Sequence, residues 1–135
     1  MIERRLIDTN LIVRFLTKDH EKHSPLAKNL FTACNRGEVV LVILPVVLAE
    51  CVFVLESFYK HPADKIATTL ASLITSPNVE IANASLYLDA LRRYGKTRLH
   101  FVDSVLAASA AADNMPVASF DAELRKIPDV TVKND

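Results

Sequence analysis

The sequence is poor in glycine and has no excess charge of either sign. Its 135 residues include only two glycines and six prolines, so long flexible linkers are not expected. Sixteen Lys and Arg residues balance sixteen Asp and Glu residues, and the formal net charge is zero. A strongly basic domain is the usual electrostatic sign of a nucleic-acid partner. Any such partner must therefore be argued from local charge and from a site.

Cysteines and long apolar runs are also scarce. Cys34 and Cys51 lack Cys-x-x-Cys spacing, so we expect buried free thiols, which suits a reducing cytoplasm. The N-terminus has no apolar run long enough for a signal peptide. The most apolar stretch, residues 39–55, is short for a membrane span and contains Pro45 and Glu50. We therefore expect a cytoplasmic protein with no membrane segment.

What is present is an alternation of short β-branched runs with longer helical stretches. The expected strands are residues 5–8, 39–44, 79–81, 117–119 and 130–132. Helices are expected directly after the first strand and over residues 24–37, 45–58, 62–75, 85–94, 101–113 and 122–125. Ser24 is expected to be the N-cap of the second helix, and Gly95 to end the helix over residues 85–94. Strands separated by helices predict an α/β domain with a mainly parallel sheet. The length and the lack of repeats predict one domain over residues 1–135.

Two aspartates directly follow predicted strands. Asp8 ends the first strand, and Asp121 follows the fourth strand after Ser119 and Phe120. In open α/β sheets, ligands bind in the crevice beyond the carboxyl ends of the strands. Each aspartate is equally compatible with a simpler role, as the cap of the helix that follows it.

Two further acids interrupt helices that are otherwise apolar. Glu50 is the only charged residue within 39–55, where an ionised carboxylate is costly unless a cation or hydrogen-bond donors compensate it. Asp103 and Ser104 interrupt the apolar stretch 101–112 in the same way. The alternatives are a helix-edge or arginine-paired glutamate at position 50, and a helix cap at position 103.

The four acids become more informative as a set, because all of them can lie at one edge of one sheet. Two carboxylates about 4 Å apart repel by roughly 4 kcal/mol at an effective dielectric of 20, so such a cluster needs a counter-ion. Ligands that are all oxygen favour Mg²⁺ or Mn²⁺ over zinc. His20 and His23 lie among lysines and are expected to be solvated. The predicted metal ligands and catalytic residues are Asp8, Glu50, Asp103 and Asp121.

The acids lie in the segments Asp8–Leu16, Leu48–Val52, Phe101–Ala107 and Ser119–Asp121. With these segments, in this order and spacing, the chain resembles PIN-domain ribonucleases, specifically VapC-type toxins of toxin–antitoxin pairs. The resemblance implies a three-layer α/β/α sandwich around a short, mainly parallel sheet. It also implies Mg²⁺ or Mn²⁺ held by the four acids, and an RNA substrate that is cleaved by hydrolysis.

Several polar residues beside the acids match supporting positions of the family. Thr9 and Asn10 flank the first aspartate and are expected, with Ser104 and Ser119, to orient the metal ligands. Ser119 stands where threonine is frequent, and the hydroxyl is retained. Asn114 stands where glycine is common, and asparagine also tolerates the left-handed backbone region.

A basic segment, residues 92–100, leads directly into the helix of Asp103 and contains no acid. Its cations could grip RNA phosphates, which would make binding sensitive to salt. The simpler interpretation is a helix C-terminus that favours cations, followed by a solvated loop. For Arg14, two roles likewise stay open: a contact with an RNA phosphate and a structural ion pair. The candidate RNA-binding residues are Arg14, Arg92, Arg93, Lys96 and Arg98.

The third and fourth helices carry more apolar surface than one small domain needs to bury. We therefore expect a homodimer and a contact with a cognate antitoxin protein, as the family implies. Two other functions stay open. One is a catalytically inactive binding module on the same fold. The other is a haloacid-dehalogenase-like phosphatase, which usually needs a second aspartate where this chain has Asn10.

Overall fold

Three short parallel strands form the central sheet in the computed structural model, which describes residues 1–135. The strands β1 (Arg4–Leu6), β2 (Val40–Ile43) and β3 (Val79–Ile81) lie in the order β1-β2-β3. Leu41 in the middle strand is fully buried, as expected for the centre of a sheet covered by helices. The predicted α/β class with a parallel sheet is confirmed.

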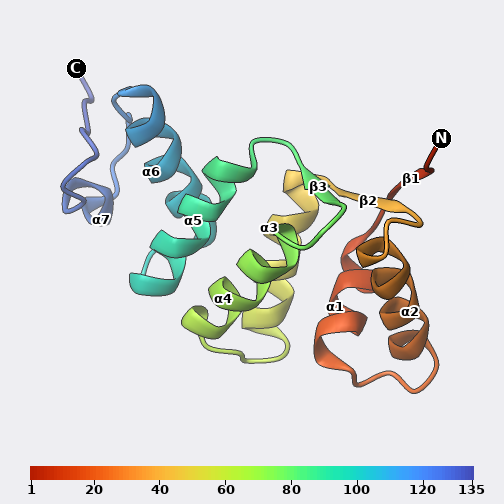
Figure 1. Ribbon diagram of the computed structural model, residues 1–135. Coiled ribbons are helices and arrows are strands. Elements are labelled where there is room, and N and C mark those ends of the chain that lie inside the picture. Colours follow the sequence, from red (N-terminus) through yellow and green to blue (C-terminus); the bar gives the residue numbers. More distant parts are fainter.

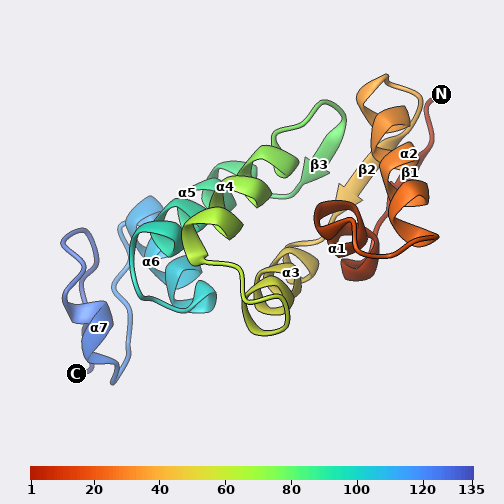
Figure 2. The ribbon, with the colours of Figure 1, turned by 90° about the horizontal axis from the view of Figure 1, so that it is seen from below.

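Seven helices accompany the sheet, in agreement with the expected α/β/α architecture. The helices between the strands are α1 (Thr9–Thr17), α2 (His23–Asn35), α3 (Pro45–Ser57) and α4 (Ala63–Ile74). The helices after β3 are α5 (Ala84–Lys96), α6 (Phe101–Asp113) and α7 (Ala122–Arg125). Each helix packs mainly on its neighbours, α1 on α2 and α3, α4 on α5, and α5 on α6. The molecule is therefore elongated, with α1 and α2 at one end and α7 at the other (Figures 1 and 2).

Local sequence signals explain most helix boundaries. Pro45 begins α3, and Leu44 before it is extended, because the proline ring disfavours helical geometry in the preceding residue. Asn114 ends α6 in the left-handed region, with φ 50°, as predicted. The prediction that Gly95 closes the fifth helix is wrong. The helix α5 continues to Lys96, and a Cβ at Gly95 would lie 2.7 Å from Cβ of Ala67 in α4, so this glycine permits close packing of α4 on α5.

The second helix also begins differently from the prediction. We expected Ser24 to cap it, but α2 already includes Ser24, and the cap position belongs to Lys22. The Ser24 hydroxyl instead donates to the carbonyl oxygen of Arg14 at 2.7 Å. Ser24 is buried, and its hydrogen bond links α2 to α1. A serine that is equally suited to capping its own helix is thus used for a tertiary contact.

Buried apolar residues form two separate clusters of very different size. The main cluster has 24 buried residues and surrounds β2, α3 and α4. The second has only three, Ala107, Ala110 and Val130. It lies between α6 and the residues that follow it, and we call residues 101–135 the C-terminal unit. This unit therefore has little apolar core of its own.

The predicted strands 117–119 and 130–132 do not join the central sheet. Val117 forms an isolated parallel bridge with Val132, in which the Val117 amide donates to Thr131 at 2.8 Å and the Lys133 amide donates to Val117 at 2.9 Å. The helix α6 packs along α5 and carries both segments away from β1 (Figure 1). The prediction of a fourth and fifth strand in the same sheet is wrong for this reason.

No helix of the chain is long and apolar enough to cross a membrane. The apolar stretch that most resembles a span is divided at Pro45 into β2 and α3, as predicted. Cys34 and Cys51 are free and buried, which confirms the expectation for both cysteines.

Candidate active site

Asp8 lies two residues beyond the end of β1 and caps α1. Its Oδ1 accepts a hydrogen bond from the Leu11 amide at 3.0 Å, so the capping role considered from the sequence is present. Capping occupies one carboxylate oxygen, and the side chain is exposed. The same aspartate is therefore available to a ligand at the carboxyl end of β1.

Glu50 is exposed on α3, contrary to the expectation that its charge is held in an apolar environment. The helix turns this position outward, so the carboxylate bears no burial cost that a cation must offset. It does lie near Asp8. Burial, followed by the negative charges of Glu50 and Asp8, raises the pKa of Cys51 to about 12. One buried thiol thus experiences both carboxylates, and these two acids share one region of the molecule.

Thr9 adds an unusual feature to this region. It is buried, and its Oγ1 has no hydrogen-bond partner, while neighbouring Asn10 is exposed. An unsatisfied buried hydroxyl costs about 1–3 kcal/mol, and such atoms in native proteins call for an explanation. The Thr9 hydroxyl meets the Cys51 thiol, whose pKa it lowers against the effect of burial, and it has no stronger partner. A weakly partnered hydroxyl in the region of two carboxylates fits the supporting role predicted for Thr9.

A groove of about 590 Å³ opens beside Asp8. Its polar lining comes from Asp8, Asn10, Arg14, His20 and His23. The two imidazoles stack with ring centroids 4.1 Å apart, and burial together with the charges of His23 and Arg14 lowers the pKa of His20. The prediction that both histidines are merely solvated missed this arrangement, because the turn between α1 and α2 that brings them to the groove is a tertiary feature.

Arg14 sits in that groove but has an acidic neighbour of its own. Its Nη1 lies 3.5 Å from Oδ1 of Asp19, which supports the structural ion pair that the sequence left open. The Arg14 side chain remains partly exposed, and so a second contact with a phosphate is sterically available.

Asp103 lies in the first turn of α6 and is half-buried. The cap position belongs to His100, and Asp103 makes no capping hydrogen bond, so the simpler interpretation of this aspartate is wrong. Ser104 beside it is fully buried, and its hydroxyl donates to the carbonyl oxygen of His100 at 3.2 Å. Ser104 is therefore used by its own helix.

Asp121 caps the short helix α7 through a hydrogen bond from the Glu123 amide to Oδ1 at 2.9 Å. The Ser119 hydroxyl accepts from the Asp121 amide at 3.0 Å, so Ser119 does support this acid. The Asn134 side chain bridges Ser119 in turn, with both of its hydrogen bonds 2.9 Å long. A capped turn thus presents Asp121 at the surface.

The four predicted acids do not come together within one copy of the chain. No group of three or more His, Cys, Asp or Glu side chains is close enough to hold a metal ion. The helices α1 and α7, which Asp8 and Asp121 cap, lie at opposite ends of the molecule in both views (Figures 1 and 2). Asp8 and Glu50 alone have the right oxygen chemistry for Mg²⁺ but are too few for the complete set expected, so the acids of one copy do not fit that metal site.

The basic segment divides into structural and free cations. Arg93 is buried, and its guanidinium donates to Asp89 at 3.0 Å and to Asp129 at 2.9 Å. It therefore ties the C-terminal unit to α5 and is not a free RNA contact. Arg92 is exposed and also pairs with Asp89, whereas Lys96 and Arg98 are exposed and make no ion pair.

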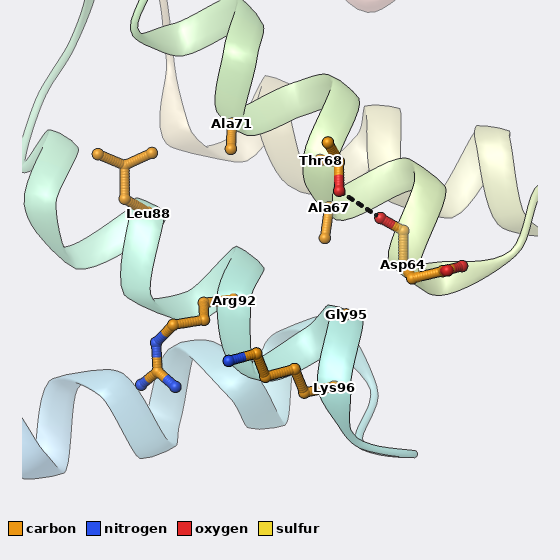
Figure 3. A pocket seen from close by; sticks show the side chains of 8 residues that line it. All are labelled: Asp64, Ala67, Thr68, Ala71, Leu88, Arg92, Gly95 and Lys96. Carbon is orange, nitrogen blue, oxygen red and sulfur yellow. Dashed lines mark hydrogen bonds between the residues drawn. The ribbon is translucent and has the colours of Figure 1, made fainter.

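Two of these cations line a second groove, of about 430 Å³, between α4 and α5. Figure 3 shows Arg92 and Lys96 on the α5 wall, with Asp64 and Thr68 on the opposite wall from α4. The Thr68 hydroxyl donates to the carbonyl oxygen of Asp64 at 2.9 Å. Lys96 has no ion-pair partner, and Arg92 is exposed although it pairs with Asp89, so both can meet an anion at the mouth of the groove. The sequence did not reveal the α4 wall of this groove.

Comparison with known protein families finds the PIN domain, which matches residues 5–130. A search of curated protein sequences returned no match. The matched region includes β2, β3, all of β1 except Arg4, all seven helices and the four acids. With an acidic pair beyond the first strand of a parallel α/β fold, the chain belongs to the PIN-domain family.

Proposed function

We propose that this protein is an endoribonuclease, the toxin of a toxin–antitoxin pair, that hydrolyses RNA phosphodiester bonds with the help of Mg²⁺ or Mn²⁺. PIN domains are generally nucleases, which makes a hydrolase acting on nucleic acid the function class of the fold. The observation that carries the proposal is the pair Asp8 and Glu50 in one region beyond the carboxyl end of β1, with the buried hydroxyl of Thr9 beside the Cys51 thiol that experiences both acids. We treat residues 1–135 as one nuclease domain.

The residues of this chain supply binding and positioning. Asp8 and Glu50 concentrate negative charge beside a groove, and the buried hydroxyl of Thr9 lies beside the Cys51 thiol. A divalent metal, when bound by such carboxylates, neutralises phosphate charge and lowers the pKa of a bound water. Of the four acids proposed to hold it, Asp8 and Glu50 lie in one region of this structure, and Asp103 and Asp121 do not join them in one group.

RNA binding is assigned to the exposed cations of the basic segment. Arg92 and Lys96 line the groove between α4 and α5, and exposed Arg98 follows Lys96 closely in the sequence. Phosphate contacts of this kind release counterions, so the affinity should fall as salt rises. Arg14, which lies in the groove beside Asp8, stays a candidate RNA contact. Arg93 does not, because its guanidinium is used in structural ion pairs.

The partners proposed are a second copy and a cognate antitoxin. Large apolar side chains are exposed on or near α3, namely Val46, Phe53 and Phe58, with 71%, 67% and 76% exposure. Exposed apolar surface of this extent on one helix is typical of a protein–protein contact. The two free buried cysteines favour the cytoplasm as the location of the complex.

The test is incubation with total cellular RNA and Mn²⁺ or Mg²⁺, followed by mapping of new 5′ ends. We expect cleavage by the wild type and its loss with a chelator or with Asp8→Asn or Asp103→Asn. Asp113→Asn, at the far end of α6, is the matched control and should cleave normally. Cleavage that persists undiminished with the chelator and in both variants would refute the site.

Two alternatives give different results in the same assay. An inactive binding module would retain RNA in a filter-binding measurement and leave it intact. A phosphatase would release inorganic phosphate without cutting the chain, and the family match favours the nuclease over it.

A further inference from the structure

The turn between α1 and α2 holds His20 in a fixed position. The His20 amide donates to Oγ of Ser24 at 3.2 Å, and the Ser24 amide donates to the carbonyl oxygen of His20 at 3.0 Å. The Ser24 hydroxyl is buried and donates in turn to the carbonyl oxygen of Arg14 in α1 at 2.7 Å. The His23 amide donates to Nδ1 of the His20 ring at 2.9 Å. Both backbone groups of His20 and one of its ring nitrogens are therefore engaged, which fixes the ring.

The imidazoles of His20 and His23 form a flat platform with a free donor. Their planes are 13° apart, and their centroids are separated by 4.1 Å. Burial, followed by the charges of His23 and Arg14, lowers the pKa of His20, which keeps this ring neutral at pH 7. A neutral ring whose Nδ1 accepts a hydrogen bond carries its proton on Nε2, and no protein group accepts from that nitrogen. His23 is exposed, so the platform is open to a planar ligand.

Two adjoining grooves share His20. The groove of about 590 Å³ beside Asp8 includes it, and so does another groove of about 600 Å³, which is lined by Lys18, Glu21 and Lys28. Both lysines are exposed and make no ion pair. A continuous surface therefore runs from Asp8 past His20 to the two lysines, around the turn between α1 and α2.

The chemistry of this surface fits single-stranded RNA. Proteins that hold such RNA combine aromatic side chains, on which bases stack, with cations that follow the phosphates. Arg14 and the two lysines outnumber the acids of the lining, Asp8 and Glu21. Arg14 keeps free donors beside its 3.5 Å contact with Asp19. The groove between α4 and α5 offers cations as well, but it has no aromatic ring and none of the four site acids.

We propose that these two grooves, which we call the α1–α2 track, bind the single-stranded RNA next to the bond that is cleaved. One base stacks on the imidazole pair, and Nε2 of His20 donates to an acceptor of that nucleotide. Arg14 and the two lysines contact the phosphates on either side. The inference rests on the proposed function, since that function places the cleaved bond at Asp8. The track then selects the nucleotide beside the cleavage site.

The first test measures binding without cleavage. A short, fluorescently labelled single-stranded RNA of random sequence is titrated with protein in the presence of a chelator, and its anisotropy is recorded. Stacking on an aromatic side chain is worth enough that His23→Ala should weaken binding roughly 5- to 100-fold. His61→Ala, a histidine that lines neither groove, is the control and should bind as the wild type does. Unchanged affinity of His23→Ala would overturn the stacking platform.

The second test separates phosphate contacts from stacking. The logarithm of the affinity falls with the logarithm of the salt concentration by about 0.7 for each phosphate contact to a single strand. Lys28→Gln should reduce this slope by about one contact, whereas His23→Ala should leave it unchanged. Lys65→Gln, an exposed lysine of α4 outside both grooves, is the matched control. A slope for Lys28→Gln equal to that of the wild type would show that the RNA does not reach the second groove.

The third test locates the RNA on the unmodified protein, so it does not depend on how a variant folds. RNA that contains 4-thiouridine is cross-linked to the wild type by light, and the modified peptides are identified by mass spectrometry. Cross-links are expected within residues 14–28. Cross-links confined to residues 64–71 and 92–98 would place the RNA in the groove between α4 and α5 and overturn the track.

Cleavage of total cellular RNA with Mn²⁺ separates this inference from the proposed function. If the wild type cleaves and His23→Ala and Lys28→Gln bind RNA as the wild type does, the track is wrong and the function stands. If the wild type binds RNA along the track and never cleaves it, the function fails and the binding surface remains. If it neither binds nor cleaves RNA, both fail.

Discussion

The two ends of the molecule are held together in different ways. The end that contains β1, β2 and α3 is organised by a continuous cluster of 24 buried apolar residues. The C-terminal unit has a cluster of only three buried apolar residues of its own, while its Phe101 and Ala108 belong to the main cluster. Polar contacts, the Arg93 ion pairs and the Asn134 bridge to Ser119, add to the packing of α6 on α5. Apolar burial is non-directional and tolerates small shifts, whereas hydrogen bonds and ion pairs hold one orientation. The first end is therefore the scaffold with the larger core, and the second is attached to it by helix packing and a few directional contacts.

The four predicted site acids are divided between these two parts of the molecule. Asp8 and Glu50 belong to the scaffold, and Asp103 and Asp121 belong to the C-terminal unit.

The largest expected effect concerns the scaffold. Leu41→Ala removes a fully buried side chain from the central strand and should lower the free energy of unfolding by about 2–5 kcal/mol. Urea denaturation followed by circular dichroism measures it. Val130→Ala, in the small cluster, is the matched change and should cost clearly less. Equal losses would contradict the division into scaffold and unit.

The next effect concerns the attachment of the C-terminal unit. Arg93→Ala leaves Asp89 and Asp129 without their cation and should cost about 1–3 kcal/mol, with the loss concentrated in local rather than global unfolding. Hydrogen exchange of residues 117–135 should accelerate while that of β2 stays slow. Arg125→Ala, an exposed arginine with no ion pair, is the control. Uniform acceleration across the chain would argue against a separately held unit.

Acid should loosen the same attachment. The hydrogen bond from Arg93 lowers the pKa of Asp129, and those from Arg92 and Arg93 outweigh burial and lower the pKa of Asp89. A carboxyl with a lowered pKa stabilises the fold above its unfolded value of about 3.9, and this contribution is lost as the pH falls through the folded value. Exchange in residues 117–135 should therefore increase below about pH 4. Asp129→Asn should weaken this pH dependence, and an unchanged profile would show that the pair is not responsible.

The smallest effect concerns the buried hydroxyl of the scaffold. Thr9→Val keeps the side-chain shape and removes an Oγ1 whose contact with the Cys51 thiol is weak, so the free energy of unfolding should stay level or rise by about 1 kcal/mol. Differential scanning calorimetry gives the change, and Thr69→Val on α4 serves as a comparison outside the site. A clear loss of stability would show that a protein group satisfies the hydroxyl. RNA cleavage by the same variant should fall if Thr9 supports the acids.

Much of the scaffold was predictable from the sequence. The β-branched run of β2, the start of α3 at Pro45 and the end of α6 at Asn114 all depend on short-range preferences that residues carry wherever they stand. The free, buried state of both cysteines and the resemblance to PIN domains could also be predicted from the residues and their order along the chain.

Tertiary structure alone decided the rest. The outward turn of Glu50, the use of Arg93 as an anchor and the placement of residues 117–119 away from β1 depend on which helix packs on which. A strand of three residues gains too few local interactions to select its partner, so its pairing follows from distant contacts. The sequence by itself determined that four acids are present in the order and spacing of a PIN domain. Their distribution between the scaffold and the C-terminal unit followed only from the packing of α6 on α5.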